Sequence, residues 1–353
     1  MKNKKTFIIA EAGVNHNGEL KKAHQLIDIA ASAGADAVKF QTINPIFLST
    51  KNAKLAKYQK KKKNYQSQIE MLKKIQLPLK AFKELSKHAL EKNLTFLSTA
   101  FDKESLDYLT EIVKVKILKV PSGEINNFEY LSWIKSKKLP IILSTGASTN
   151  KEIISSYNFL TSREKKIDKI NKIIDHKKIL DKKFNNDLFI LHCTSEYPAP
   201  LEDLNLRCIE TLRKTFPCKV GYSDHSKSLI VPSIAVSLGA NIIEKHFTTN
   251  NKLKGPDHHM SLNPKELKET IINIRRCEQS LGSYKKKVTS SEIKNKSIIR
   301  RVLVANINVK KGEKFTEKNI ICKRSNTGIS ASRYFKFLGK KSKFNLKKDQ
   351  SIK

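Results

Sequence analysis

The sequence predicts an α/β protein, a TIM-type (β/α)8 barrel followed by a small β-rich domain. Short β-branched apolar runs alternate with longer amphipathic segments through the first part of the chain, which is the pattern of a parallel sheet with crossover helices. Towards the C-terminus this alternation gives way to short β runs with no barrel period. We therefore place the barrel domain at 1–284, a linker at 285–297 and the β-rich domain at 298–353.

Eight segments are predicted to be the barrel strands, because each is a short apolar run bounded by turn residues. In chain order they are 6–13, 37–42, 95–101, 115–123, 140–146, 187–198, 219–226 and 240–247. Helical periodicity fills the segments between them, as in 20–35 and 264–282. Two connections are unusually long. We expect 43–94 to hold a lysine-rich loop and two helices, and 161–186 to be a charged insert outside the barrel.

The charge balance is strongly basic, with 69 Lys and Arg against 33 Asp and Glu and a formal net charge of +36. Most of the basic residues are lysine. Recognition of phosphates and bases in nucleic acids instead favours the guanidinium fork of arginine. We interpret lysine runs such as 57–66 as solvated faces. Nucleic acid is therefore not expected as a partner, although the positive field would attract small anions.

The cysteine pattern and the apolar runs indicate a cytoplasmic protein. The five cysteines form no CxxC pair and are odd in number, so neither a disulfide framework nor a structural zinc site is expected. The N-terminal apolar run ends at Glu11, which is too early for a signal peptide. The longest apolar stretch, 229–243, is interrupted by Pro232 and Gly239 and is too short to span a membrane.

Each predicted strand ends in polar or charged residues. These are Glu11; Lys39 and Gln41; Ser98 and Thr99; Ser122 and Glu124; Ser144 and Thr145; Ser195 and Tyr197; Ser223, Asp224 and His225; Glu244 and His246. The C-terminal ends of barrel strands meet on one face, where the active sites of this fold lie. Strands that merely reach solvent would explain one or two such ends but not all eight, so we expect a functional site there.

Two histidines at this face suggest a metal site. His225 and His246 end the seventh and eighth predicted strands, which would be neighbours about 4.8 Å apart. Two imidazoles on one divalent ion leave positions open for water or substrate, which favours Mn²⁺ or Mg²⁺ over structural Zn²⁺. His258 and His259 lie in a loop, and we expect them to be outside the ligand set or solvated.

Two lysines at the same face suggest an anion site. Lys39 and Lys119 end the second and fourth predicted strands, and hydroxyls follow from neighbouring strand ends. Ammonium groups between hydroxyls suit a compact phosphate or carboxylate. Taken alone, either lysine could equally be a residue whose aliphatic stem is buried and whose ammonium group reaches solvent.

Motifs along nearly the whole chain resemble, in order, those of the bacterial sialic acid synthases. They are IAEAGVNHNG (9–18), VKFQT (38–42), FLSTAFD (96–102), KVPSGEINN (119–127), ILSTGA (142–147), LHCTSEYPAP (191–200), GYSDHS (221–226), and EKHFT with GPDH (244–258). The segment 310–330 resembles the C-terminal antifreeze-like, or SAF, domain of that family. The motifs look closest to the legionaminate branch, and the neuraminate branch shares most of them.

The resemblance implies condensation of phosphoenolpyruvate with N-acetylmannosamine, or with a related 2,4-diacetamido-trideoxy hexose, and water. The products would be N-acetylneuraminate or N,N'-diacetyllegionaminate and phosphate, released by C–O cleavage. It implies catalytic roles for Glu11, His225 and His246, the two histidines also holding Mn²⁺ or Mg²⁺. Phosphoenolpyruvate would be bound by Lys39, Thr99, Lys119, Ser122, Ser144, Ser195 and Ser223, and the sugar by Gln41, Glu124, Tyr197, Asp257 and Arg324.

The resemblance also implies a homodimer with exchanged C-terminal domains, in which Arg324 reaches the partner's site. The chain departs from the family pattern at Ala100, at Ala147 and in the loop KRSNTG (323–328). The alternative is another metal-dependent TIM-barrel aldolase or hydrolase that acts on a phosphorylated or carboxylated small molecule. A hydrolase of this kind would normally have two histidines in an HxH pair after the first strand, and this chain has only His16 there.

Overall fold

The structure, a computed structural model, describes residues 5–50, 53, 67–164 and 166–353. Two compact units, Met1–Gly282 and Ser283–Lys353, make up the chain. The exact residues at which the predicted barrel domain, linker and β-rich domain begin and end stay predictions. Helix α13 (Ser290–Ile299) occupies much of the segment predicted as a linker.

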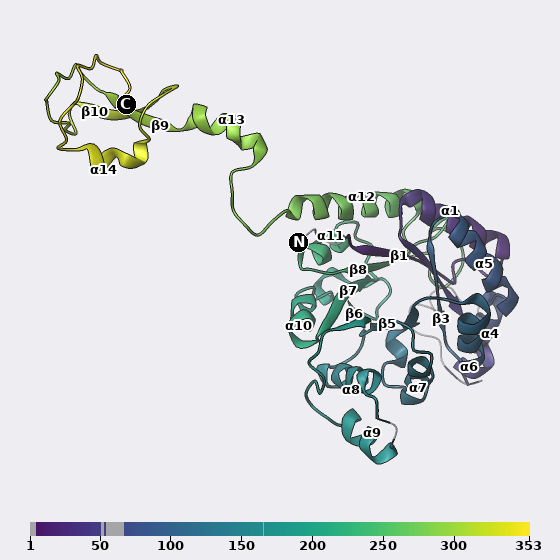
Figure 1. The fold of residues 1–353 in the computed structure, drawn as a ribbon. Helices are drawn as coiled ribbons and strands as arrows, with labels where there is room; N and C mark the ends of the chain where they lie inside the picture. The colour runs from purple at the N-terminus through teal and green to yellow at the C-terminus, as the bar shows by residue number, and fades with distance from the viewer. Residues whose placement is uncertain (1–4, 51–52, 54–66, 165) are drawn as a thin grey trace. The chain divides into compact units, whose positions relative to one another are not determined.

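The first unit contains an eight-stranded parallel sheet that curls into a nearly closed barrel, surrounded by helices (Figure 1). The strands are β1 (Phe7–Gly13), β2 (Ala37–Thr42), β3 (Thr95–Ala100), β4 (Leu118–Val120), β5 (Ile141–Ser144), β6 (Asn185–Cys193), β7 (Cys218–Asp224) and β8 (Ile242–His246). Hydrogen bonds join them in the order β3-β2-β1-β8-β7-β6-β5-β4, and β3 also packs against β4. The predicted TIM-type barrel is confirmed.

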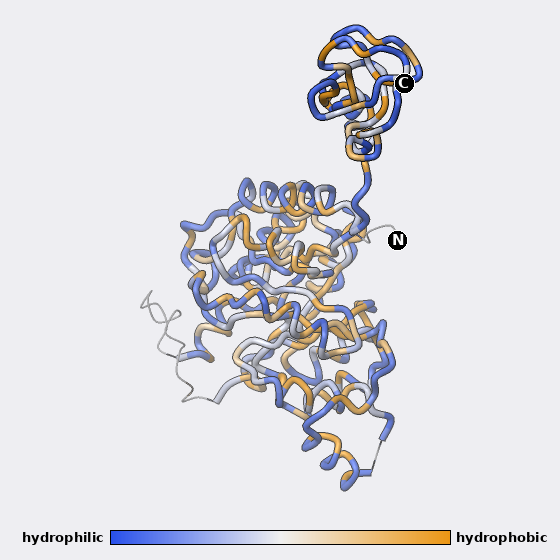
Figure 2. Tube along the Cα trace, turned by 90° about the vertical axis from the view of Figure 1, so that its left-hand side faces the viewer, coloured by the Kyte–Doolittle hydropathy of each residue, from blue (hydrophilic) through white to orange (hydrophobic). Residues whose placement is uncertain are grey.

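The helices follow the strands in alternation, as the sequence period predicts. They are α1 (Leu20–Ala33), α2 (Pro45–Leu48), α4 (Gln68–Ile75), α5 (Leu79–Glu91), α6 (Lys103–Asp107), α7 (Phe128–Ser136), α8 (Asn150–Thr161), α9 (Ile167–Ile174), α10 (Cys208–Thr215), α11 (Val231–Ser237) and α12 (Pro264–Leu281). Capping boxes at Thr149–Glu152 and Asn263–Glu266 fix the starts of α8 and α12. Hydrophilic and hydrophobic residues alternate along these helices (Figure 2).

Two apolar layers hold the barrel together. The larger lies between the strands and the helices. The smaller fills the inside of the barrel with Ile9, Ala37, Leu97, Ile142, Leu191 and Ile242, which are all buried. Because side chains alternate along a strand, the residue two positions further on faces the same interior. The side chains two positions further towards the C-terminal ends of the strands therefore form the next layer inside the barrel.

The described parts of the two long connections contain helices that lie outside the barrel strands. The predicted insert 161–186 contains α9, which packs on α8, and Asn158 of α8 donates a hydrogen bond of 2.9 Å to the carbonyl of Lys178. The connection 43–94 contains α2, α4 and α5. Within it, residues 51–52 and 54–66, including most of the lysine run 57–66, lie outside the described residues.

The second unit is small and β-rich, as predicted. Strand β9 (Arg301–Ala305) pairs antiparallel with β10 (Ile320–Arg324), and helix α14 (Tyr334–Phe337) follows them. Its core consists of Leu303, Ala305, Val309, Phe315, Ile320, Leu346 and Ile352. No helix among the described residues of either unit is long and apolar enough to cross a membrane.

Candidate active site

The candidate site is the polar layer directly above the inner apolar layer. Two positions after Ile9, Ala37, Leu97, Ile142, Leu191 and Ile242 come Glu11, Lys39, Thr99, Ser144, Cys193 and Glu244. All six are buried. The same alternation that packs the core therefore turns this ring of reactive groups inwards.

Two lysines and two glutamates form a buried charge cluster at the centre of the layer. Lys39 Nζ lies 2.9 Å from Glu11 Oε2 and 3.7 Å from Glu244 Oε2. Lys119 Nζ lies 3.4 Å from Glu244 Oε1 and 2.8 Å from the Ser144 hydroxyl. The four side chains are at most 4% exposed. Buried charges need partners, and here each lysine faces at least one carboxylate.

The environment gives the two carboxyl groups different pKa values. Burial raises the pKa of Glu11 to about 7, against the lowering effect of Lys39. Burial also acts to raise the pKa of Glu244, but Lys119 and Lys39 together hold that pKa at about 2. Glu244 is therefore ionised while Glu11 is poised to gain or lose a proton near neutral pH, which suits a general acid or base.

The cluster is bordered by hydroxyl and thiol groups, as the predicted anion site requires. Thr99 accepts a hydrogen bond of 3.3 Å from Lys39, and Ser223 donates one of 2.9 Å to Glu244. Ser122 accepts one of 2.9 Å from the backbone N–H of Gly146. A Cβ at Gly146 would collide with the side chains of Ser195, Cys193 and Ser122, so the close approach of this backbone requires glycine.

The imidazoles of His225 and His246 lie beside the cluster, with ring centroids 5.5 Å apart. His225 Nδ1 lies 2.6 Å from the carbonyl oxygen of Thr194, so this nitrogen carries the proton and Nε2 is left with its lone pair. His246 Nδ1 is buried and has no hydrogen-bond partner among the described residues. Burial lowers the pKa of both histidines, that of His225 to about 4, which keeps both rings neutral.

Most of the predicted site residues line two small cavities at this face. One, of about 270 Å³, is lined by Glu11, Lys39, Gln41, Thr99, Lys119, Ser122, Ser144, Ser195, Tyr197, Ser223, His225 and His246 among others. The other, of about 110 Å³, adds Asp257. It also has an apolar wall of Val14, Ile43, Met71, Leu72 and Ile75, the last three from α4.

Two predicted site residues do not line these cavities. Glu124 lies in the turn after β4, is partly exposed, and accepts a hydrogen bond of 2.7 Å from Asn127. Arg324 is exposed at the end of β10 in the second unit. Their roles stay predictions.

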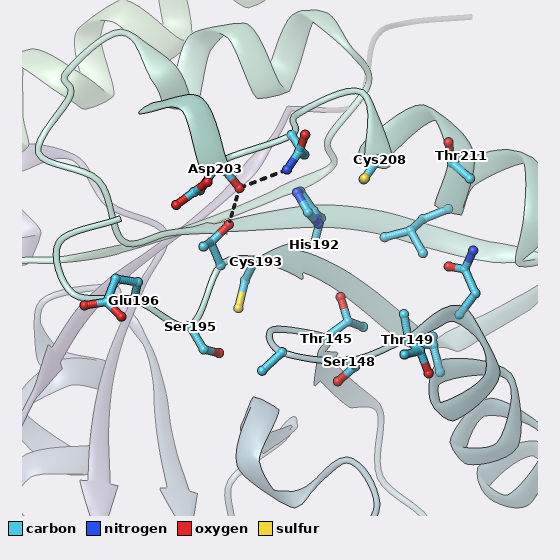
Figure 3. Close-up of a pocket in the computed structure, with 16 residues that line it drawn as sticks. Thr145, Ser148, Thr149, His192, Cys193, Ser195, Glu196, Asp203, Cys208 and Thr211 are labelled. Atoms are coloured by element: carbon cyan, nitrogen blue, oxygen red, sulfur yellow. Dashed lines mark hydrogen bonds between the residues drawn. The ribbon is translucent and has the colours of Figure 1, made fainter. Parts of the chain in front are cut away.

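Glu244 and Cys193 belong to the layer but were not assigned a role from the sequence. Both could have been found from their spacing, because each follows an inner-core residue by two positions. Cys193 also borders a larger cavity of about 580 Å³ (Figure 3), which shares the lining residues Cys193 and Ser195 with the cavity of about 270 Å³. The loops after β5 and β6 form its walls, with Thr145, Ser148 and Asp203 among the lining residues.

The loop that carries Asp257 is fixed by a buried histidine. His258 lies 2.6 Å from the Thr248 hydroxyl and 3.1 Å from Asn17 Oδ1 in the β1 loop, and it is fully buried. It is therefore not solvated, and its place outside the ligand set stays a prediction. Burial raises the pKa of Asp257 to about 6.

Fold and site together define a TIM-barrel enzyme whose strand ends carry two buried lysines, a buried glutamate with a raised pKa and a pair of neutral imidazoles. The chain belongs to the NeuB family, whose model matches residues 26–286, and residues 300–353 match the SAF domain. The predicted sialic acid synthase and SAF resemblance is confirmed.

Named relatives agree with this assignment. The chain is 46% identical over 351 residues to the N,N'-diacetyllegionaminic acid synthase of Campylobacter jejuni, covering 99% of both chains. It is 40% identical over 341 residues to the enzyme of that name from Legionella pneumophila, covering 96% and 91%. Among solved structures, it matches the N-acetylneuraminic acid synthetase of Leptospira borgpetersenii with a TM-score of 0.68 and 34% identity, covering 83% and 90% of the two chains.

Proposed function

We propose that this chain condenses phosphoenolpyruvate with a 2,4-diacetamido-trideoxy hexose and water, giving N,N'-diacetyllegionaminate and phosphate. The observation that carries the proposal is the buried anion site of Lys39 and Lys119 in the same cavity as His225 and His246. An anionic three-carbon donor and a polarised aldehyde need these two sites side by side. The similarity to the two N,N'-diacetyllegionaminic acid synthases supports the same reaction.

Phosphoenolpyruvate carries a phosphate and a carboxylate, and the site offers two cations and several hydroxyls for them. Lys39 and Lys119 would supply the charge, with Thr99, Ser122, Ser144, Ser195 and Ser223 as hydrogen-bonding groups. Both lysines are buried, so they act on the anion in a medium of low dielectric constant. Holding the donor in one orientation over the aldehyde carbon lowers the entropic part of the barrier.

A divalent cation, Mn²⁺ or Mg²⁺, fits the histidine pair. His246 Nδ1 is a buried nitrogen with no hydrogen-bond partner in the described part of the chain, and both rings are in the neutral form that binds metals. No group of three or more His, Cys, Asp and Glu side chains able to hold a metal occurs among the described residues, so the pair would leave coordination positions open. When bound, such an ion would polarise the carbonyl oxygen of the aldehyde.

The chain's own residues direct the remaining chemistry. The C2=C3 π electrons of phosphoenolpyruvate form a bond from C3 to the aldehyde carbon, and the C=O π electrons move to the aldehyde oxygen, which takes up a proton and becomes a hydroxyl group. Positive charge is left at C2. Glu11, with its pKa near neutrality, takes a proton from the water that adds to C2, which balances the proton gained by the aldehyde oxygen. The C–O bond to phosphate then breaks, and the new hydroxyl group at C2 gives its proton to the departing phosphate and becomes the keto oxygen. Lys39 and Lys119 stabilise the departing phosphate.

The sugar pocket favours the trideoxy hexose over N-acetylmannosamine. Its polar side is formed by Gln41, Tyr197 and Asp257, which suit hydroxyl and amide groups. Among the described residues, its apolar lining consists of Val14, Ile43, Met71, Leu72 and Ile75, whose side chains offer no strong hydrogen-bonding group. A sugar that lacks hydroxyls loses nothing against such a wall, whereas a buried hydroxyl without a partner costs about 1–3 kcal/mol.

The purified protein should therefore release phosphate from phosphoenolpyruvate with Mn²⁺ and the diacetamido-trideoxy hexose, and much less with N-acetylmannosamine. With phosphoenolpyruvate carrying ¹⁸O in the bridging position, the label should appear in phosphate, because the C–O bond breaks. Mass spectrometry of the two products measures this. Label retained in the keto acid would mean P–O cleavage and would refute the proposed site chemistry.

We also propose a homodimer in which the partner subunit's Arg324 contacts the sugar. The prediction is complementation: Glu11→Ala and Arg324→Ala homodimers should each be nearly inactive, and mixed dimers should regain activity. Random mixing would leave about a quarter of the sites intact, since one of the two sites in each heterodimer carries no lesion. Phosphate release after co-refolding measures the recovery. No recovery would place Arg324 in its own chain's site.

A cytoplasmic location is part of the proposal. All five cysteines, each a described residue, are free thiols, as expected in a reducing compartment.

A further inference from the structure

A buried ion pair that the proposed reaction does not use lies just outside the site. Lys245 Nζ is 2.5 Å from Asp224 Oδ2, and the two side chains are 2% and 0% exposed. Asp224 ends β7, Lys245 lies in β8, and the two residues are partners in the sheet register. Since Ser223 and Glu244 meet inside the barrel, alternation turns Asp224 and Lys245 to the helix side of the sheet.

The pair is the centre of a small hydrogen-bond network. Lys245 Nζ also donates to the carbonyl oxygen of Ser226, at 2.5 Å. Asp224 Oδ1 accepts from the backbone N–H of Ser226 at 2.9 Å and from the Tyr222 hydroxyl at 3.4 Å. The network therefore ties down the backbone on both sides of residue 225 and joins it to residue 245.

His225 and His246 are the residues that this network brackets. His225 lies between Asp224 and Ser226, and His246 directly follows Lys245. The ring of His225 contacts the Thr194 carbonyl through Nδ1 at 2.6 Å and the Ser223 hydroxyl through Nε2 at 3.4 Å, and His246 Nδ1 has no hydrogen-bond partner among the described residues. The hydrogen bonds of Asp224 and Lys245 thus fix the ends of β7 and β8, from which both imidazoles project.

We propose that Asp224 and Lys245 are positioning residues that set the separation of His225 and His246, and so set the affinity of the site for a divalent cation. This inference rests on the proposed function, because it assumes that the two imidazoles bind the ion. Stability alone is a poor reason for such a pair, since two charges lose much hydration on burial and apolar residues often replace them without loss. A role in positioning the two histidines would explain why the chain keeps two buried charges despite their lost hydration.

The test compares Mn²⁺ affinity with thermal stability and with phosphoenolpyruvate affinity. Lys245→Met leaves the Asp224 charge buried and unpaired, so the variant Lys245→Met/Asp224→Asn, in which both are neutral, is the main one. We expect its melting temperature to be near that of the wild type. Its dissociation constant for Mn²⁺, measured by calorimetry, should rise about 10- to 100-fold, as for other groups that orient metal ligands.

Two controls separate positioning from general damage. Phosphoenolpyruvate binding to the metal-free double variant should be close to wild type, because Lys39 and Lys119 lie on β2 and β4. Arg275→Met removes an ion pair of 2.6 Å with Asp36 at the other end of the strands. It should lower the melting temperature without changing Mn²⁺ affinity.

The remaining outcomes also test the inference. Wild-type Mn²⁺ affinity in the double variant would show that the pair only stabilises the fold. If the double variant does not fold, Lys245→Arg, which keeps the charge but changes the geometry of the pair, takes its place. Weaker Mn²⁺ binding at a melting temperature near that of the wild type would then support the inference, and unchanged Mn²⁺ affinity would overturn it. Wild-type protein that makes product without binding Mn²⁺ would overturn the metal part of the proposed function as well. That result is distinguishable, because it appears before any substitution is made.

Discussion

Replacing either His225 or His246 by alanine is expected to abolish turnover while leaving the fold intact. Each substitution removes one of the two neutral imidazoles of the pair. A Lewis acid contributes several kcal/mol to the transition state, so the expected loss is about a thousandfold or more. Phosphate release at saturating phosphoenolpyruvate measures it, and circular dichroism checks the fold.

The matched control is His24→Ala. His24 lies on α1 outside the barrel, where its Nε2 is 2.9 Å from Glu84 Oε1, and its loss should leave turnover unchanged. Chelation of the wild type should abolish activity, and added Mn²⁺ should restore it. Full activity after exhaustive chelation would contradict a metal role for the pair.

Lys119→Met is expected to raise the KM for phosphoenolpyruvate roughly 100-fold. Lys119 is buried, hydrogen-bonded to Ser144 and paired with Glu244, so its removal takes positive charge from the anion site and leaves Glu244 closer to the incoming anion. Loss of one partner of a buried, hydrogen-bonded charge pair costs about 3 kcal/mol, and ~1.4 kcal/mol is a factor of ten. Initial rates over a range of phosphoenolpyruvate concentrations separate KM from kcat.

Lys135→Met is the control for this prediction. Lys135 is a half-buried lysine on α7 that donates to the carbonyl oxygen of Phe159 at 2.8 Å, away from the cavity. Its loss should leave the KM unchanged. An unchanged KM in Lys119→Met as well would show that the anion binds elsewhere, for example in the larger cavity beyond Ser195.

The strands could be predicted from the sequence because each is a β-branched run with a clear boundary. Their ends could be predicted less well. The fourth was expected over 115–123 and is only Leu118–Val120, since Pro121 has no N–H for the ladder and Ser122 begins a 3-10 turn. The sixth was expected to reach residue 198, but it ends at Cys193, before the loop that carries Tyr197.

The site could be predicted where it depends on strand alternation. Lys39, Thr99 and Ser144 follow this rule, and the same rule applied without exception would have included Glu244 and Cys193. It could not be predicted where loops from distant parts of the chain meet. The burial of His258 depends on Asn17, 241 positions earlier, and no local pattern indicates that contact. The role of Arg324 depends on the assembly of two chains.

The apolar wall of the sugar pocket has a consequence for how this protein could change its substrate. Met71, Leu72 and Ile75 belong to α4, in the connection between β2 and β3, whereas the charge cluster stands on the strands themselves. If this cavity holds the acceptor, as we propose, substitutions in α4 would change its apolar lining while the charge cluster stays in place. Such substitutions could change the accepted hexose without altering the donor chemistry, which would let a lineage diversify its sugar products without rebuilding the catalyst.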